Sequence, residues 1–394
     1  MYNIMTIGIN NKIVNQNTKQ LYYAADFLFD HPEQIGEAIH SVEFLCEKFE
    51  ELGFSIQMNP TDEKFGFKAV YEKGEGGVSI GLLCEYESMP NGHSCAHHIQ
   101  GPIMMAVAHH LIYSNIDKPY KLVVYGVSQT IMMEKNKSHL HNWIKGIDVA
   151  LQVHGDNVTA PLISRYTGVD LIATFVGKPA HETEAPWDAK PPLDAVILCQ
   201  QGMEFLRGHT KIGTRFLSKL LKLSGTNGEL NPAVNKIELG FRTHDETDIE
   251  NLKRRLIKLI HGAAMMTDID VSIEIDHVID NMKSIDSLNK LLIDKATHYG
   301  ITHEAKDTLF ENSSLDFINV SHSVPSAVMR IAAVPENVMI NTKEFLSYGK
   351  ANCMHDSINI GASIISDTVN ELIYHPELIK TIQNEFAQTI TMEH

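Results

Sequence analysis

A nearly continuous apolar run from Val78 to Cys84 is the feature that most constrains the fold of this chain. Alternation of apolar and polar residues is typical of a strand with one exposed face, whereas an unbroken run predicts a strand covered on both faces. Strand-like and helical segments then alternate, which is the pattern of a doubly wound α/β sheet. The segments predicted next are a helix at His97–Tyr113, a strand at Lys121–Gly126, a helix at His139–Lys145 and a strand at Asp148–His154.

Two helices are predicted ahead of this sheet. From Lys19 to Phe54 apolar residues recur at helical spacing, with an interruption near Pro32. Gly53 stands where a glycine commonly ends a helix. The segment FGFKAVYE, residues 65–72, then predicts a strand that a glycine-rich turn joins to the strand at Val78.

The pattern changes near Thr167 and changes back after Val278. Between these points we predict a strand at Gly168–Gly177, a helix at Leu193–Arg207, strands near Lys236–Arg242, a helix at Asp248–Met265 and a strand at Asp270–Asp276. Two helices among antiparallel strands are typical of an α+β domain. We therefore predict an α/β domain with a doubly wound mixed sheet, residues 1–166 and 279–394, interrupted by an inserted α+β domain, residues 167–278.

Charge and cysteine content limit the partners and the compartment. The 33 Lys and Arg against 49 Asp and Glu give a formal net charge of −16, which argues against nucleic acid and anionic membranes as partners. The five cysteines are scattered and odd in number, so they do not form a disulfide framework. We see no secretory signal and no apolar stretch of about 18 residues that could span a membrane. We expect a soluble, cytoplasmic protein.

The densest group of chemically active side chains is the segment GHSCAHH at Gly92–His98. In an extended segment Cys95 and His97 would project to the same side, as two ligands of one metal require. His154 ends a predicted strand and would face the same crevice, because ligands bind at the carboxyl ends of strands in such sheets. His355 would join them from the far end of the chain. Each of these residues also has an alternative interpretation. The segment Gly92–His98 could be a helix entry with surface histidines and a buried thiol. His154 could be a histidine at an ordinary strand end, and His355 a residue of a helix cap.

These motifs, together with one in the insertion, occur in the order known from one protein family. His181 ends the sequence GKPAH inside the insertion, where a lid can present it to a substrate. The motifs are EYESMP at 85–90, GHSCAHH at 92–98, GKPAH with the following APW and LDA, the segment from Asn231 to Arg242, and the segment from Ser314 to Pro325. Together they resemble the metal-dependent amidohydrolases and peptidases that include aminoacylases, carboxypeptidases, aminobenzoyl-glutamate hydrolase and auxin-conjugate hydrolases.

The resemblance implies a di-metal catalytic domain and an inserted lid that also forms a homodimer. The metal ligands that it implies are Cys95, His97, His154 and His355, with Cys95 as the bridge between two ions. Zinc is the expected metal, manganese and cobalt are alternatives, and one or two ions are bound. His181 and Asn231 would belong to the lid's contribution to substrate or transition-state binding, sometimes made across the dimer.

One family motif is missing. The family's GTPAEE segment supplies a glutamate that activates the metal-bound water and a second that binds the metal, but Thr130 and Ile131 occupy these positions here. General-base help is typically worth about 10²–10⁴ in rate. Glu134 is our candidate for the missing base, with a solvated loop glutamate as the alternative. Glu85 and Glu87 are two further candidates for the role.

Two functional hypotheses follow. The first is a metal-dependent hydrolase that cleaves the amide or peptide bond of a small N-acyl amino acid, dipeptide-like molecule or short peptide. The second is a catalytically inactive descendant that acts as a binding or regulatory protein, because a fold does not guarantee a function. A purely structural role for the histidines is a third possibility.

Overall fold

In the computed structural model of the chain, the described residues form two compact units. The structure describes residues 11–58, 65–128, 137–163, 166–181, 183–223, 233–301 and 317–391. The first unit comprises the described residues of 11–163, 282–301 and 317–391, and the second unit comprises those of 166–281. The second unit is therefore an insertion within a first unit that is discontinuous in sequence.

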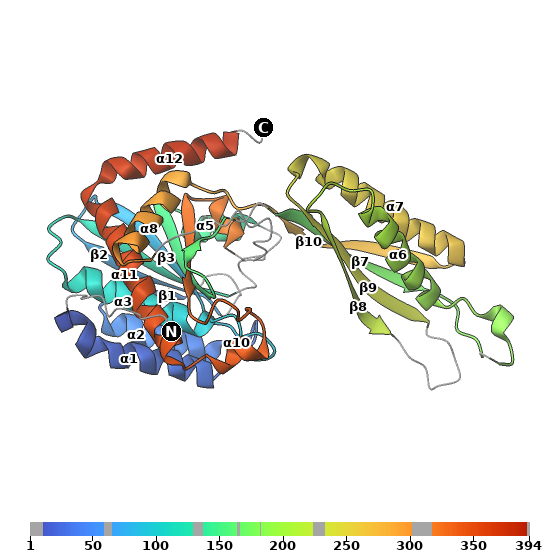
Figure 1. The fold of residues 1–394 in the computed structure, drawn as a ribbon, viewed down its shortest axis with the longest axis horizontal. Helices are drawn as coiled ribbons and strands as arrows, with labels where there is room; N and C mark the ends of the chain where they lie inside the picture. Colours follow the sequence, from blue (N-terminus) through green and yellow to red (C-terminus); the bar gives the residue numbers. More distant parts are fainter. Residues whose placement is uncertain are drawn as a thin grey trace. The chain divides into compact units, whose positions relative to one another are not determined.

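A seven-stranded mixed sheet forms the centre of the first unit (Figure 1). The strand order is β1-β2-β4-β3-β5-β11-β6. Strands β4, β3, β5 and β11 are parallel, whereas β1, β2 and β6 run antiparallel to their neighbours. The residues that follow β3 and β5 therefore meet at one edge of the sheet. The strands are β1 (Ser55–Met58), β2 (Phe67–Lys73), β3 (Val78–Glu85), β4 (Tyr120–Val127), β5 (Val149–Asp156), β6 (Ala160–Pro161) and β11 (Ser326–Ala332).

Helices cover both faces of this sheet. On one face α1, α2, α3, α8, α11 and α12 pack around strand residues such as Leu82 and Leu151. On the other face α5 and α9 pack around residues such as Leu83 and Ala150. Successive residues of β3 thus enter different cores, which explains why this strand is apolar at consecutive positions. The helices are α1 (Asn11–Asp30), α2 (Ile39–Glu51), α3 (Gln100–Tyr113), α5 (Lys137–Ile144), α8 (Asp286–His298), α9 (Ile318–Ser321), α10 (Lys343–Ser347), α11 (Asn352–Tyr374) and α12 (Pro376–Thr391).

The second unit contains a four-stranded antiparallel sheet with the order β10-β7-β9-β8. Helices α6 and α7 cover one face around a core that includes Phe175, Leu239 and Leu256. The opposite face carries a buried ion pair, in which the Arg242 guanidinium donates to both carboxylate oxygens of Asp170 at 2.8 and 2.7 Å. The elements are β7 (Thr167–Val176), α6 (Pro192–Arg207), β8 (Arg215–Leu223), β9 (Val234–Thr243), α7 (Ile249–Thr267) and β10 (Asp270–Ile279).

The predicted fold class, an α/β unit with a mixed sheet, is confirmed. The two opening helices are present, and Gly53 has the positive φ of +90° expected after a helix. Strands β1, β6 and β8 were not predicted. All three lie at sheet edges, β6 has only two residues, and β1 is short and mostly exposed, so none carries the apolar pattern of a buried strand.

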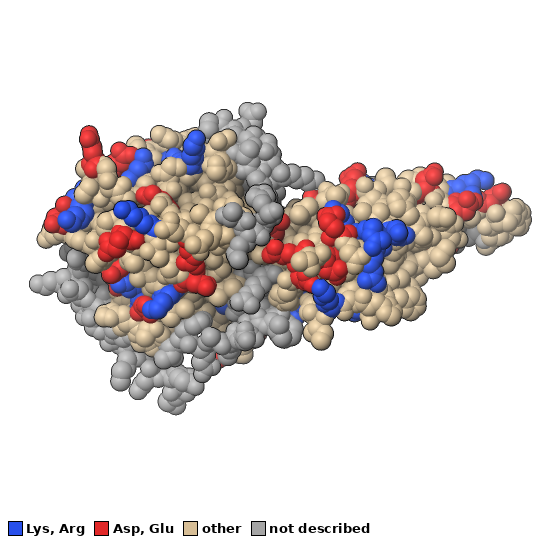
Figure 2. Space-filling view, turned by 90° about the horizontal axis from the view of Figure 1, so that it is seen from above, with Lys and Arg blue, Asp and Glu red and all other residues tan. Residues whose placement is uncertain are grey.

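The surface carries charges of both signs. Figure 2 shows acidic and basic side chains close to one another on both units. Among the described helices, none is both long enough and apolar enough to cross a membrane.

Candidate metal centre

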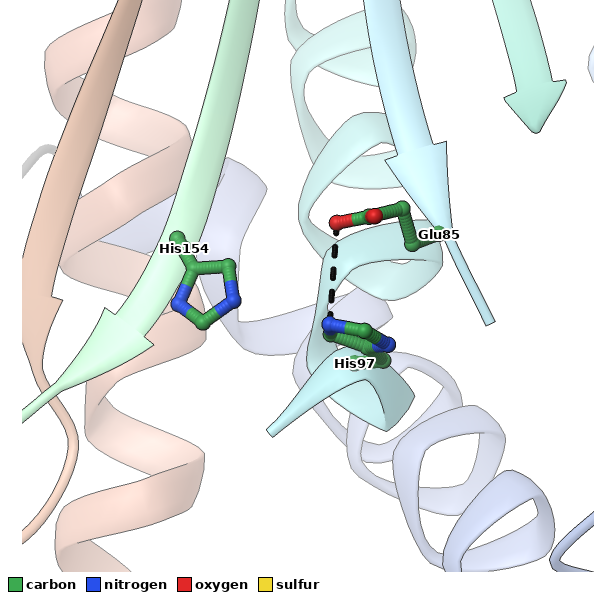
Figure 3. A group of neighbouring side chains, drawn as sticks. All are labelled: Glu85, His97 and His154. Atoms are coloured by element: carbon green, nitrogen blue, oxygen red, sulfur yellow. Dashed lines mark ion pairs between the residues drawn. The ribbon is translucent and has the colours of Figure 1, made fainter. Parts of the chain in front are cut away.

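Three buried side chains meet at the carboxyl edge of the parallel strands (Figure 3). Glu85 is the last residue of β3, His154 lies near the end of β5, and His97 begins the short 3-10 helix η1 (His97–Ile99). Their ligand atoms all lie within 4.8 Å of one another. The Nε2 atom of His97 is 3.6 Å from Oε2 of Glu85. The His97 and His154 rings are nearly perpendicular, with centroids 5.4 Å apart.

Hydrogen bonds to the backbone fix both imidazole rings. The Nδ1 atom of His97 lies 2.9 Å from the carbonyl oxygen of Glu87, and Nδ1 of His154 lies 2.8 Å from that of Gly155. A carbonyl oxygen only accepts, so each Nδ1 is the donor. In the neutral ring Nε2 then carries the lone pair that binds a metal. A histidine ligand held through its other nitrogen is the usual arrangement around protein-bound metals.

Two glutamine amides hold the Glu85 carboxylate. Gln152 Nε2 donates to Oε2 of Glu85 at 2.9 Å, and Gln100 Nε2 donates to the same oxygen at 3.2 Å. The two glutamines are joined by a further bond of 3.1 Å from Gln152 Nε2 to Gln100 Oε1. Glu85 is 3% exposed and both glutamines are fully buried. The carboxylate therefore has a fixed position beside the two histidines.

Burial and neighbouring charges perturb both histidines. Burial lowers the pKa of His97, but Cys95, Glu85 and the hydrogen bond to Glu87 outweigh this effect and raise the pKa to about 10. Burial and the charge on His97 lower the pKa of His154. In the absence of a metal, the charges of Cys95 and Glu85 thus favour a proton on His97, and a metal ion bound at Nε2 would take the place of that proton.

The three side chains fit a divalent metal. Two imidazole nitrogens and one carboxylate oxygen are a donor set of catalytic zinc sites. Around a tetrahedral zinc ion, ligand atoms at about 2.0–2.2 Å from the metal are roughly 3.3–3.6 Å apart, close to the observed 3.6 Å between His97 and Glu85.

The loop that delivers His97 differs from the prediction. Ala96 has a left-handed conformation with φ of 60°, and η1 begins directly after it. The segment from Cys95 to His97 is therefore not extended, because this turn redirects the backbone between them. Gly155 makes room for the turn, since a Cβ at that position would lie 2.5 Å from the Ala96 side chain.

Two of the four predicted ligands lie outside the group of three. Cys95 is buried and hydrogen-bonds to the His97 ring, but among the described residues its sulfur is not within 4.8 Å of all three ligand atoms. The His355 ring stacks on Tyr22, and its Nε2 lies 2.9 Å from Oδ1 of Asp26 on α1. His97 and His154 are brought together as predicted. The assignment of Cys95 and His355 as ligands stays a prediction.

His98 directly follows His97, and its side chain makes a hydrogen bond that stabilises the fold. Its Nε2 atom donates to the carbonyl oxygen of Gly349 at 3.0 Å, and its side chain is fully buried. Burial lowers the pKa of His98 to about 3, so the ring stays neutral. The hydrogen bond of His98 thereby connects the segment Gly92–His98 to the segment that leads into α11.

We expect His98→Leu to lower the free energy of unfolding by about 1–3 kcal/mol, because it leaves a buried carbonyl oxygen without its donor. Urea unfolding followed by circular dichroism measures the change. The same substitution at His110, which is exposed on α3, should change stability by less than about 0.5 kcal/mol. Equal effects at the two positions would show that the bond to Gly349 adds nothing.

The remaining predicted residues lie elsewhere or outside the described residues. His181 lies in the second unit, where its Nδ1 atom accepts from the backbone N–H groups of Thr183 and Glu184, both at 3.3 Å. Asn231 and Glu134 lie outside the described residues, as do Thr130 and Ile131. Glu87 is held by the backbone N–H of Gly36 and the Ser128 hydroxyl at 3.0 and 2.6 Å.

Four residues of the site go beyond the prediction from the sequence. Glu85 is predicted only as a candidate base, although it ends a strand at the same sheet edge as His154. Gln100, Gln152 and Asp26 are not predicted. A polar residue at position 152 inside the apolar segment VALQVH was the available signal, because a buried amide in such a strand needs a partner.

Comparison with known proteins places this fold. No family model matches the chain. A dinuclear metal-binding peptidase of the M20 family from Bacillus subtilis has a TM-score of 0.63 at 12% identity, over 91% of this chain and 98% of that one. The chain thus has the fold of the M20 metallopeptidases, and the resemblance to metal-dependent amidohydrolases is confirmed.

Two further proteins are similar to this chain. A p-aminobenzoyl-glutamate hydrolase subunit from Escherichia coli K12 is 24% identical over 339 residues, which are 78% of this chain and 68% of that protein. An aminobenzoyl-glutamate utilization protein from Klebsiella pneumoniae has a TM-score of 0.58 at 12% identity, over 91% of this chain and 96% of that one.

Proposed function

We propose that this chain is a metal-dependent amidohydrolase that cleaves the amide or peptide bond of a small N-acyl amino acid or dipeptide-like substrate. The observation that carries the proposal is the buried group of His97, His154 and Glu85 at the carboxyl edge of the parallel strands. Ligands bind at this edge in open α/β sheets. The sequence relationship to a p-aminobenzoyl-glutamate hydrolase supports the class of substrate.

His97 and His154 would hold the metal through their Nε2 atoms. A divalent ion supplies polarisation of the scissile carbonyl and a lowered pKa for water. The hydrogen bonds from the Nδ1 atoms to the backbone keep both rings in the tautomer that binds a metal. Zinc is the ion we propose, because two imidazoles and a carboxylate are typical of catalytic zinc sites.

His181 is proposed to bind the substrate or the transition state from the inserted unit, as the family resemblance implies. Because backbone N–H groups donate to its Nδ1 atom, the proton of the neutral ring is on Nε2. An Nε2–H donor is what the stabilisation of a developing oxyanion requires. Asn231 is proposed, on the same resemblance, as a second lid residue. Glu134 is proposed as the general base, because Thr130 and Ile131 leave the family's two acidic positions without a carboxylate.

We expect His181→Ala to lower kcat/KM by about 10²–10³ while the bound metal stays unchanged, because the variant removes a transition-state donor and no ligand. Steady-state kinetics and metal analysis of the same preparation measure the two effects. Loss of the ion from the variant would instead make His181 a metal ligand.

A homodimer through the inserted unit and a cytoplasmic location complete the proposal. Apolar side chains are exposed on α6 and the edge strand β8, among them Ile197 at 54%, Phe205 at 67% and Leu220 at 41%. Exposed apolar groups of this kind are typical of surfaces that another chain covers. The mass of the protein in solution, measured by light scattering, tests the dimer.

The activity is tested with purified protein supplied with zinc, manganese or cobalt. Release of the free amino acid from p-aminobenzoyl-glutamate, N-acetyl amino acids and dipeptides is measured, with the chelated protein as control. Metal-dependent release supports the proposal. An intact metal centre without release from any compound would favour the second hypothesis, a binding protein that has lost the acid pair at Thr130 and Ile131.

A further inference from the structure

We propose that the centre of this chain holds a single ion and that Glu85 is its carboxylate ligand, beside His97 and His154. The inference rests on the proposed function, because it assigns the ligands of the same centre. It departs from the family pattern in two respects. The ligand set includes Glu85, which is not among the ligands that the family resemblance implies, and the described residues leave a second ion without a full set of ligands.

The first argument is the position of the carboxylate. Oε2 of Glu85 is 3.6 Å from Nε2 of His97, and one ring nitrogen or carboxylate oxygen of each of the three residues lies within 4.8 Å of those of the other two. Ligand atoms about one tetrahedral ion need separations of roughly 3.3–3.6 Å, so small side-chain rotations are enough to close the set. All three side chains are buried and therefore shielded from competing water.

The second argument is the support behind the carboxylate. A buried carboxylate that serves only as an ion-pair partner of one histidine is costly to keep, because the pair must repay the desolvation of both groups. Here two buried amides, those of Gln100 and Gln152, orient the carboxylate toward the histidines. Such supporting hydrogen bonds are characteristic of metal ligands, so we assign Gln100 and Gln152 as positioning residues.

The third argument concerns the second ion. His355 is the predicted ligand from the C-terminal part of the chain, but its Nε2 atom is bound to Asp26 and its ring is stacked on Tyr22. The acid pair of the family is replaced by Thr130 and Ile131, of which neither carries a carboxylate. With the acid pair replaced and the histidine engaged by Asp26, the described residues offer a second ion too few ligands.

Cobalt binding tests the inference without any need for turnover. The metal-free protein is titrated with Co²⁺ by calorimetry for stoichiometry and affinity, and by absorption for the sulfur-to-cobalt band that a Cys95 ligand would produce. We expect one ion per chain. Glu85→Gln should weaken binding by at least about 100-fold, and Gln152→Met by about 10-fold, since changes behind a ligand typically cost 10–100-fold.

Glu87→Gln is the matched control, because Glu87 is also a buried glutamate of the same loop but is bound to Gly36 and Ser128. It should keep the affinity within about threefold, as should His355→Gln. Thermal unfolding of each metal-free variant shows whether it is folded, and Glu85→Asp, which keeps the charge, should recover part of the affinity where Glu85→Gln does not.

Three results would overturn the inference: two ions per chain, full affinity in Glu85→Gln, or loss of the ion in His355→Gln. Failure of the proposed function is a separate result. A chain that binds one cobalt ion through Glu85 but hydrolyses nothing would uphold the ligand assignment and remove the amidohydrolase activity.

Discussion

Replacing His154 by alanine is expected to lower metal affinity by more than about 100-fold and to reduce hydrolysis below detection. Substitutions behind a ligand already cost about 10–100-fold, and removal of a ligand itself costs more. His154 is buried, and its Nδ1 atom is fixed by the carbonyl of Gly155, so the alanine variant removes a ring that is already held beside His97 and Glu85. Metal content after dialysis and turnover of the best substrate measure both effects.

The control for this prediction is His109→Ala, which removes a half-buried histidine of α3 outside the group of three. It should retain both metal and activity. Circular dichroism must show that His154→Ala is folded. A folded His154→Ala protein that keeps its full metal content would exclude His154 as a ligand and with it the centre as we describe it.

Replacing Asp170 by alanine is expected to destabilise the second unit by roughly 3 kcal/mol. Loss of one partner from a buried ion pair typically costs about 3–5 kcal/mol, because the other charge is left without compensation. The lower end applies here, since the Arg242 side chain is 18% exposed and also donates to the carbonyl of Phe241 at 2.9 Å. Gly240 shows how closely Asp170 is packed, because a Cβ there would lie 2.0 Å from its Oδ1 atom.

Hydrogen exchange of the backbone amides in β7 and β9 measures this loss within the second unit. Glu238→Ala is the control on β9, because Glu238 pairs with exposed Lys219 at 3.8 Å and such pairs contribute less than about 1 kcal/mol. The double variant Asp170→Leu, Arg242→Met should recover most of the stability, since an apolar pair leaves no buried charge. A single variant as stable as the natural chain would show that the ion pair is dispensable.

The strands of the sheet that are buried on both faces could be predicted from the sequence. Leu82 and Leu83 enter separate cores, and this appears in the sequence as adjacent apolar residues. Edge strands carry no such pattern: in β8, Lys219 and Leu217 are both on the surface, so neither period-two alternation nor an apolar run emerges. The apolar pattern of a strand therefore reflects its burial more than its intrinsic strand preference.

The site was predictable in part, for a reason that particular residues make clear. His97 stands out in a segment with three histidines and a cysteine, His154 stands out near the end of a strand, and both reach the centre. The geometry of the loop before His97 depends on the left-handed conformation of Ala96. This conformation is expected of glycine, so the sequence does not predict it for an alanine. Gln100 on α3 binds Glu85 on β3, and Asp26 on α1 binds His355 on α11, so only the tertiary structure brings these partners together.

The place of β11 in the first unit bears on how the chain is made. This strand pairs with β5 and is the second strand from one edge of the sheet, although the whole second unit separates the two strands in sequence. On the ribosome, β1 to β5 emerge first, the insertion follows, and β11 and α11 come last. The insertion can bury its own core on release, while the exposed edge of β5 must wait for its neighbour. We therefore expect the second unit to fold before the first unit is complete. Nascent chains stalled before β11 should depend on chaperones, which prevent aggregation through the open edge of β5.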